Sequence, residues 1–444
     1  MALIVMPFFI LYCVLTGKHI ASLKQRLGLL TPEQFTWQHP IRIWLHAASV
    51  GEVQAARALI SELNKTDIHA DLILSTVTEQ GRIVAEQQLG NQVTCLYAPI
   101  DLPWIVNRFI MAIKPSLYIC LETELWPNML RMLKLAGIKT LLLNGRMSER
   151  SFGHYRLISS FMTQVMSSLT AAATISTSDM EKYADLGLAR EKIIVCGNAK
   201  YDLGISSSLT PNEDAPRDNL LNARQTTESH KLNIEPGQPV LVAGSTHSGE
   251  EESLIMVHQA LRNELPDLIM VIAPRHLDRL GAIEAFLKKE KINFQKLSEL
   301  DGTNRTAAII LVDYMGELTR LYAAATYAFC GGSLVDRGGH NIMEPAIWGI
   351  PPFYGPYMKD FADAAQIFKA NGAGFSVNSA QDLINKIIYF NKHKVEYSQA
   401  GQAAKDIAQS QQGAARKQVR LIAKLLATAN NQTNRKDNES TCCS

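Results

Sequence analysis

Acidic and basic side chains stand directly after apolar runs at several points of the sequence. The segment His46–Glu52 (HAASVGE) follows one such run and places Glu52 where a helix is predicted to begin. A carboxylate in the first turn of a helix can cap free backbone N–H groups, which is its commoner role. Aimed into a cleft, the same carboxylate can act as a general base on a hydroxyl group. The segment by itself leaves both interpretations open.

Two further carboxylates follow the apolar run LYIC, in the segment Leu121–Asn128 (LETELWPN). Side chains alternate along an extended chain, so Glu122 and Glu124 are predicted to point to opposite sides unless the strand has already ended. One of them at most is then expected to face a given site. Carboxylates are costly to bury without partners, so each must reach water or have a task. Trp126 and Pro127 are predicted to shape the turn and pack.

Basic groups occur at two more junctions in this half of the chain. The segment Asn144–Ser151 (NGRMSERS) suits an anionic ligand, and an ordinary surface turn explains it equally well. The segment Gly197–Asp202 (GNAKYD) places Lys200 just before a polar, turn-rich stretch. Lone lysines are usually solvated, so its position is the reason to consider Lys200.

The second half of the chain has junctions that suit phosphate groups. The segment Gly244–Glu252 opens a helix and could offer backbone N–H groups to an oxyanion, although its three glutamates would repel an anion. Arg275 follows Pro274 at the end of an apolar run and can form paired hydrogen bonds to a phosphate. In Gly331–Ala346 (GGSLVDRGGHNIMEPA), four glycines let the backbone approach a ligand, and Glu344 could accept hydrogen bonds from ribose hydroxyls.

These junctions belong to a regular alternation of apolar runs with amphipathic stretches, which predicts parallel sheets covered by helices. The predicted strands are Ile41–Ala47, Leu72–Thr76, Thr94–Tyr97, Leu117–Leu121, Thr140–Leu143, Ala172–Ile175, Ile193–Cys196, Val240–Ala243, Leu268–Ala273, Ala308–Val312 and Ala328–Cys330. We therefore expect two doubly wound α/β domains that face a cleft. Ligands bind such sheets beyond the carboxyl ends of the strands.

The composition sets the domain organisation and excludes some functions. With 444 residues the chain is too long for one ordinary core, and 44 Lys and Arg against 42 Asp and Glu argue against a protein that coats nucleic acid. Seven cysteines without a CxxC spacing argue against a zinc or disulfide framework, and no metal site is expected. The expected parts are a membrane anchor (1–20), an amino-terminal domain (21–203), a linker (204–236), a carboxyl-terminal domain (237–405), a terminal helix (406–427) and a disordered tail (428–444).

The first seventeen residues are uncharged and apolar, and Lys18, Lys24 and Arg26 follow them. A cleavable signal peptide carries its charges before the apolar stretch, so we expect a short signal anchor or a helix in the membrane interface. A buried first helix of the domain is the alternative. Basic residues after an anchor stay on the cytoplasmic side. The basic amphipathic stretch Ala414–Ala427 is either a packed helix with a solvated face or a contact with anionic lipid.

Taken together, HAASVGE, ETELWPN, GNAKYD, GSTHSGEE, PRH, MGEL and GGHNIMEPA resemble the motifs of the 3-deoxy-D-manno-oct-2-ulosonic acid (Kdo) transferases, in unchanged order up to about residue 425. The resemblance implies the GT-B glycosyltransferase fold. It also implies transfer of Kdo from CMP-Kdo to the lipid A precursor lipid IVA, with inversion and without a metal or other cofactor. The enzyme would work at the cytoplasmic face of a bacterial inner membrane in lipopolysaccharide synthesis.

By matching position, the resemblance makes Glu52 the proton acceptor, and it makes Glu122 and Lys200 the groups that stabilise the transition state. The residues it assigns to CMP are Pro274, Arg275, Met315, Gly316, Glu317, Asn341, Ile342, Met343 and Glu344. The family usually has proline and leucine in place of Ile342 and Met343. The loop that holds Tyr357 and Asp360 also departs from the family pattern, which puts a ligand contact from that loop in doubt.

Two other functions fit the same elements. One is a GT-B enzyme that uses a UDP-sugar, such as a lipid-linked GlcNAc transferase or a UDP-sugar 2-epimerase. The other is a membrane-bound scaffold that has lost its activity. The presence of Glu52, Glu122, Lys200, Arg275 and Glu344 together argues against the scaffold.

Overall fold

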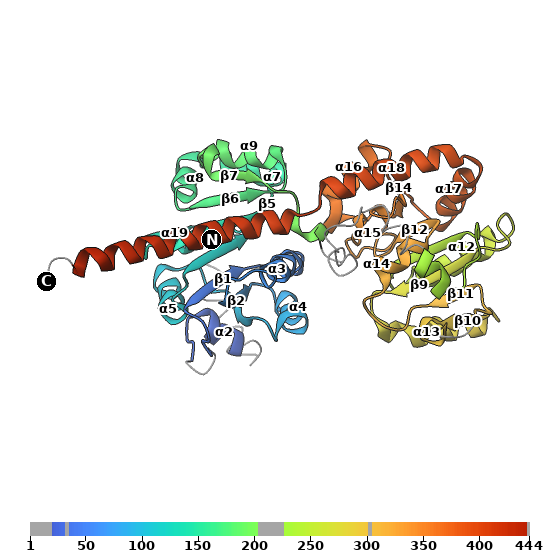
Figure 1. Ribbon diagram of the computed structural model, residues 1–444, viewed down its shortest axis with the longest axis horizontal. Coiled ribbons are helices and arrows are strands. Elements are labelled where there is room, and N and C mark those ends of the chain that lie inside the picture. Colours follow the sequence, from blue (N-terminus) through green and yellow to red (C-terminus); the bar gives the residue numbers. More distant parts are fainter. Residues whose placement is uncertain (1–19, 32–34, 203–225, 301–303, 442–444) are drawn as a thin grey trace. The chain divides into compact units, whose positions relative to one another are not determined.

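The computed structural model describes residues 20–31, 35–202, 226–300 and 304–441, and the chain forms two compact units (Figure 1). Unit 1 comprises Met1–Leu203 and Gly413–Ser444, and unit 2 comprises Gly204–Gln412. The chain therefore leaves unit 1 once and returns to it near the carboxyl terminus. The anchor expected over residues 1–20 lies almost wholly outside the described residues. Within the described parts of the chain, no helix combines the length and apolar character needed to cross a bilayer.

Unit 1 is built on a seven-stranded parallel sheet of order β3-β2-β1-β4-β5-β6-β7. The order runs outward from β1 in both directions, which is the pattern of a doubly wound fold. Each strand predicted for this part of the sequence is present, with ends shifted by no more than two residues. The strands are β1 (Ile41–His46), β2 (Ala70–Thr76), β3 (Thr94–Tyr97), β4 (Leu117–Leu121), β5 (Lys139–Gly145), β6 (Ala171–Thr174) and β7 (Ile193–Val195).

Helices cover both faces of this sheet because alternate strand residues are buried on opposite sides. On β1, Ile43 and Leu45 belong to one core cluster and Trp44 belongs to another. The first cluster is completed by α3 and α19, and the second by α5, α6 and α8. The helices of unit 1 are α2 (Ile20–Arg26), α3 (Val50–Leu63), α4 (Glu79–Leu89), α5 (Pro103–Ile113), α6 (Pro127–Leu135), α7 (Glu149–Arg156), α8 (Ser159–Met166), α9 (Thr177–Asp185) and α19 (Ala414–Thr441), with short 3-10 turns η2 (Arg190–Lys192) and η3 (Ala199–Asp202).

The carboxyl-terminal helix α19 packs on unit 1, against α3 and β5, although the chain reaches it from unit 2. Ala415, Val419 and Ile422 bury their side chains in the first core cluster. The stretch expected to form a terminal helix over 406–427 is divided, since α18 ends at Ser410 and α19 begins at Ala414. The backbone of α19 continues to Thr441, into the stretch expected to form a tail.

Unit 2 repeats the architecture with a second seven-stranded parallel sheet of order β10-β11-β9-β8-β12-β13-β14. Its strands are β8 (Val240–Thr246), β9 (Ile269–Pro274), β10 (Phe294–Lys296), β11 (Ile309–Leu311), β12 (Tyr327–Cys330), β13 (Pro352–Tyr354) and β14 (Phe375–Ser376). Its helices are α12 (Glu251–Leu261), α13 (Leu280–Lys289), α14 (Leu318–Leu321), α15 (Met343–Ala346), α16 (Ala362–Ala370), α17 (Ala380–Lys392) and α18 (Lys394–Ser410), with the 3-10 turns η4 (Leu277–Arg279), η5 (Leu297–Leu300), η6 (Tyr322–Ala324) and η7 (Lys359–Phe361).

The core of unit 2 also lies on both faces of its sheet. Leu241 and Ala243 of β8 pack with α12 and α17, whereas Val240 and Val242 pack with Tyr322 and its neighbours. Leu232 is fully buried in the second of these clusters, so the last part of the stretch expected to be a linker belongs to unit 2.

Candidate active site

The carboxyl ends of three neighbouring strands bring the first set of candidate residues together. β1, β4 and β5 are adjacent and parallel, so the turns that follow them lie at one edge of the sheet of unit 1. Glu52 follows β1, Glu122 follows β4 and Arg146 follows β5. The topology thus places the expected residues at the edge where doubly wound folds bind ligands.

Glu52 occupies the first turn of α3 and is 7 % exposed. Its carboxylate accepts hydrogen bonds from the Ala48 N–H at 2.6 Å and from the Ser49 hydroxyl at 3.0 Å. The capping interpretation is therefore correct as far as the geometry goes. Burial, followed by the negative charges of Glu124 and Glu122, raises the pKa of Glu52 to about 8. An ordinary capping carboxylate has no such pKa, because the helix N-terminus favours its ionised form.

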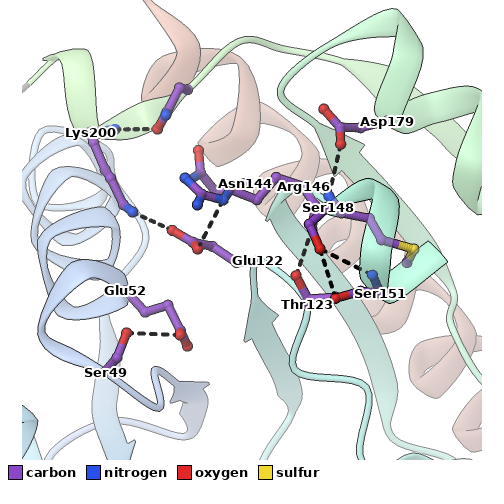
Figure 2. A network of polar contacts seen from close by, with 12 residues as sticks. Ser49, Glu52, Glu122, Thr123, Asn144, Arg146, Ser148, Ser151, Asp179 and Lys200 are labelled. Atoms are coloured by element: carbon purple, nitrogen blue, oxygen red, sulfur yellow. Dashed lines mark hydrogen bonds and ion pairs between the residues drawn. The ribbon is translucent and has the colours of Figure 1, made fainter. Parts of the chain in front are cut away.

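Glu122 forms the centre of a charged cluster with Lys200 and Arg146 (Figure 2). Lys200 is buried, and its Nζ is paired with Glu122 Oε1; Arg146 Nε lies 3.5 Å from Glu122 Oε2. The backbone of Glu122 has a φ of 54°, in the left-handed region that costs a non-glycine residue about 1–2 kcal/mol. Two hydrogen bonds hold it there, from its N–H to Leu143 O at 3.0 Å and from the Tyr183 hydroxyl to its carbonyl at 2.9 Å.

The exception allowed for Glu122 and Glu124 applies: β4 ends at Leu121 and neither residue is in the strand, so strand alternation does not decide where their side chains point. The charge of each contributes to raising the pKa of Glu52, with Glu124 the larger contributor of the two. Burial opposes ionisation of Glu124, but its hydrogen bonds from His46 and Trp126 outweigh burial and lower its pKa. Both carboxylates therefore belong to the electrostatic environment of Glu52.

His46 and Trp126 are members of this site that the sequence did not identify as such. His46 is completely buried, with Nδ1 3.0 Å from Ser75 Oγ and Nε2 3.5 Å from Glu124 Oε2. The Trp126 Nε1–H donates to Glu124 at 2.6 Å, and its ring packs edge-on against His46 with centroids 4.8 Å apart. The only signal in the sequence is that His46 begins the HAASVGE motif. Trp126 does shape the turn, and it also holds a charged group.

Gly51 allows Lys200 to approach the start of α3. A Cβ atom built on Gly51 would lie 3.4 Å from Lys200 Nζ, so a larger side chain would occupy the space around the ammonium group. Lys200 thus lies beside the helix turn that carries Glu52. The structure brings all three predicted catalytic residues into one part of unit 1 (Figure 2).

The remaining polar residues after β5 have mainly structural roles. Ser148 caps α7 by accepting a hydrogen bond from the Ser151 N–H at 3.1 Å. Thr123 Oγ1 donates to Arg146 O at 2.6 Å and so links the turns after β4 and β5. Of the segment expected to suit an anion, Arg146 is the residue that joins the charged cluster.

In unit 2, the glycine-rich loop binds an anion that the protein itself supplies. The buried carboxylate of Glu250 accepts hydrogen bonds from the N–H groups of Gly332, Ser333 and Leu334 at 2.7 Å, 3.1 Å and 2.9 Å, and from His247 at 3.0 Å. Within the helix opening at Gly244–Glu252, this carboxylate occupies the N–H group of His247. Glu250 uses this position to tie β8 to the loop after β12.

Arg275, at the end of β9, lies near three histidines that follow β8, β9 and β12. His247 and His340 stack with their rings 4° from parallel and their Nε2 atoms 2.9 Å apart, and His276 meets His247 edge-on. Burial, reinforced by His276 and by arginines that include Arg275, lowers the pKa of His247 to about 4. Burial and then Arg275 lower the pKa of His340 to about 3. Both imidazoles are therefore neutral near pH 7, and Arg275 carries the positive charge.

The other residues expected to contact a nucleotide follow β11 and β12. Met315 is 61 % exposed, and Glu317 pairs with Lys231 at 3.2 Å. Ile342 and Met343 are fully buried. Pro274 is also buried, at the end of β9.

Asn341 and Glu344 are the two polar residues of the segment after β12 that are expected to contact a nucleotide. Asn341 Oδ1 accepts from the Met343 N–H at 3.1 Å, while its Nδ2 is buried without a hydrogen-bond partner among the described residues. Glu344 accepts from Thr319 Oγ1 at 3.2 Å, which joins the segment after β12 to the segment after β11. The described residues contain no group of three His, Cys, Asp or Glu side chains placed to hold a metal ion.

Two doubly wound parallel units with polar groups at their carboxyl edges are the architecture of the GT-B fold, which many glycosyltransferases have. The chain aligns along 86 % of its length with UDP-GlcNAc 2-epimerase from Neisseria meningitidis, covering 100 % of that chain with a TM-score of 0.52 at 11 % identity, a likeness of fold. Residues 21–203 match the family model of 3-deoxy-D-manno-octulosonic-acid transferase (kdotransferase).

Full-length relatives extend this match. The chain is 32 % identical to the 3-deoxy-D-manno-octulosonic acid transferase of Haemophilus influenzae over 86 % of its length and 87 % of that protein. It is 30 % identical to the enzyme of the same name from Chlamydophila psittaci, over 86 % of its length and 84 % of that protein. The chain belongs to the 3-deoxy-D-manno-octulosonic acid (Kdo) transferase family.

Proposed function

We propose that this protein transfers Kdo from CMP-Kdo to a hydroxyl group of the lipid A precursor lipid IVA, with Glu52 as the general base. The observation that carries the proposal is the environment of Glu52. A carboxylate with a pKa near 8 is a far stronger base than an ordinary glutamate, and catalytic groups work best when their pKa lies near the operating pH. Capping Ala48 fixes the direction of the carboxylate and does not compete with this role.

The reaction is a displacement at the anomeric carbon of Kdo. Glu52 accepts the proton of the acceptor hydroxyl as its oxygen forms a bond to that carbon. The bond from the anomeric carbon to the phosphate oxygen breaks, and CMP leaves with the electron pair. Attack from the side opposite the leaving group inverts the configuration.

Lys200 and Glu122 would act on the charge that develops during this step. The carboxylate of Kdo and the leaving phosphate are both anionic, and a buried ammonium group held by Glu122 stabilises negative charge strongly in a site of low polarity. Arg146, 3.5 Å from Glu122, adds a second positive group on the same side.

The donor nucleotide would bind unit 2 through Arg275 and the segments Met315–Glu317 and Asn341–Glu344. Arg275 can form paired hydrogen bonds to the phosphate of CMP. The unpartnered Nδ2 of Asn341 offers a donor, and Glu344 offers an acceptor for ribose hydroxyls. A monophosphate leaving group neutralised in this way requires no metal ion, so we propose that none takes part.

The acceptor carries acyl chains, and unit 1 has a surface suited to a membrane. At the junction of α7 and α8, Leu157 is 83 % exposed, Ile158 49 % and Phe161 47 %. Arg150 and Arg156 of α7 precede these residues and would face anionic head groups. We propose that this surface, together with the apolar segment expected at residues 1–17, holds the enzyme at the cytoplasmic face of the inner membrane.

Incubation with CMP-Kdo and lipid IVA, followed by mass analysis of the lipid, tests the proposal and counts the Kdo units added. Glu52→Gln should keep its fold and its CMP binding and lose about 10²–10⁴-fold in turnover. Glu86→Gln, which removes a carboxylate from the exposed side of α4, is the matched control and should be fully active. Arg275→Ala should raise the KM for CMP-Kdo.

Three outcomes would overturn parts of the proposal. An active Glu52→Gln variant that is merely less stable would leave Glu52 as a helix cap alone. Tight binding of UDP without binding of CMP would indicate a UDP-sugar enzyme. Folded wild-type protein that turns over no CMP-Kdo with lipid IVA would indicate an inactive scaffold.

A further inference from the structure

The last helix of the chain holds the segment that carries Lys200. Gln418 of α19 is completely buried and bonds to two backbone groups of unit 1. Its Oε1 accepts from the Asn144 N–H at 3.0 Å, and its Nε2 donates to Gly197 O at 3.3 Å. A buried amide that satisfies two backbone groups from distant parts of the sequence fixes their relative position, because breaking either bond leaves a polar group unpaired.

Asn144 connects the backbone held by Gln418 to the segment that carries Lys200. Its Oδ1 accepts from the Ala199 N–H at 2.8 Å, and its own backbone is in the left-handed region with a φ of 53°. The Asn198 side chain then accepts from the Lys200 N–H at 3.1 Å. Gln418, Asn144 and Asn198 therefore define where the backbone of Lys200 lies.

Asp202 fastens the other end of the same segment to the start of α19. Its two carboxylate oxygens accept from the Gly413 N–H at 2.8 Å and the Ala415 N–H at 2.7 Å. These are N–H groups of the first turn, which have no partner inside the helix, so Asp202 caps α19 from a position far away in the sequence. The segment 197–202 is thus bonded to α19 on both sides of Lys200.

The hydrogen bonds of Gln418, Asn144, Asn198 and Asp202 described above form what we call the clamp. The clamp lies next to the points where the chain leaves unit 1 and returns to it. The chain leaves unit 1 after Leu203, directly following Asp202, and re-enters it at Gly413. Both connections therefore end at the Asp202–Gly413 hydrogen bond. A change in this hydrogen bond would act on the segment 197–202, which carries the lysine that pairs with Glu122.

We propose that Gln418 and Asp202 are positioning residues for the transfer reaction, which hold the ammonium group of Lys200 against Glu122. The proposal rests on the proposed function, since it assumes that Lys200 acts in the chemical step. Neither residue touches substrate in this scheme. Their effect reaches the reaction through the backbone of residues 197–202.

Kinetics of Gln418→Met test this role. The methionine fills a similar volume and makes neither hydrogen bond, and a displacement of about 1 Å can cost about 10²-fold in rate, so we expect kcat to fall ten- to one-hundred-fold with little change in either KM. Lys139→Met is the matched control, because Lys139 donates to Leu425 O of α19 at 2.9 Å without contacting the clamp. Its kcat should equal that of the wild type.

The double variant separates positioning from general damage. In a Lys200→Met background, Gln418→Met should cause no further loss of kcat, because the group that it positions is already absent. An additional loss of the same size as in the wild type would overturn the proposal. Asp202→Asn, which keeps one acceptor oxygen, provides the second variant if Gln418→Met does not fold, and the same cycle applies to it.

A chemical readout makes the inference independent of turnover. Competitive acetylation of lysines, followed by peptide mass analysis well below the melting temperature, measures how accessible and nucleophilic Lys200 Nζ is. Release from Glu122 should raise the labelling rate of Lys200 several-fold in Gln418→Met and leave it unchanged in Lys139→Met. Unchanged labelling in both variants would refute the clamp, whereas faster labelling in a protein without transferase activity would refute the proposed function alone.

Discussion

The pH dependence of the reaction should report the unusual environment of Glu52. A general base acts only when ionised, and a pKa near 8 leaves about a tenth of Glu52 ionised at pH 7. We therefore expect kcat/KM to rise about tenfold per pH unit up to pH 7 and to level off above pH 8. An ordinary glutamate would give a plateau already at pH 6.

Glu124→Gln tests how much the charge of Glu124 contributes to the raised pKa of Glu52. Burial is the largest reason for the raised pKa of Glu52, and the charge of Glu124 is the next. Removing that charge should move the acid limb of the profile to lower pH. Glu86→Gln removes a carboxylate elsewhere on unit 1 and should leave the limb in place. Initial rates of CMP release, measured from pH 5.5 to 9.5 at low donor concentration, give the profile.

An unmoved limb in Glu124→Gln, or a plateau reached by pH 6 in the wild type, would refute the reasoning.

Stability provides an independent check. Because the folded state raises the pKa of Glu52 from 4.5 to about 8, the folded protein retains a proton that the unfolded chain has released, and the free energy of unfolding falls as the pH rises across this interval. Glu52→Gln lacks this loss, so its stability relative to the wild type should increase toward pH 8, by at most about 5 kcal/mol.

Three further predictions concern the rest of the molecule. Glu250→Gln should lower the free energy of unfolding by about 2–3 kcal/mol, because the charged acceptor shared by Gly332 and three other N–H groups is lost; an unchanged urea midpoint would contradict this. Gly244→Ala should destabilise by about 1–3 kcal/mol, since its Cβ would overlap the Tyr322 hydroxyl, whereas Gly281→Ala in the open helix α13 should be neutral or stabilising. Transfer should persist in excess EDTA, and activity that EDTA abolishes and Mg²⁺ restores would show that a metal is needed.

The sheets could be predicted because buried parallel strands are continuous apolar runs. Strands such as Thr94–Tyr97 and Leu117–Leu121 were located to the residue. β10 (FQK) and β14 (FS) contain no continuous apolar run, and they and β13 were missed.

The sequence predicted which residues belong to the candidate site, but it did not predict which of them pair with each other. Motif order indicated Glu52, Glu122 and Lys200, but only the fold shows that Lys200 pairs with Glu122. The alternation argument does not apply at Glu122, because β4 ends at Leu121 and Glu122 has a left-handed backbone, a conformation that the sequence of a glutamate does not predict. Likewise, the sequence indicated the glycine-rich loop as a ligand contact, and only the fold shows that Glu250 occupies the N–H groups of Gly332, Ser333 and Leu334 at the start of that loop.

The return of α19 to unit 1 has a consequence for how the protein is made. The first core cluster of unit 1 needs Val419 and Ile422, which leave the ribosome only after the whole of unit 2. During synthesis the part of this core that α19 covers therefore stays exposed, although α3 and α4 already cover the rest of that face, and an isolated fragment that ends at residue 203 keeps that part exposed. Early termination of the message should consequently yield aggregation-prone protein even when every strand of the first sheet has been translated.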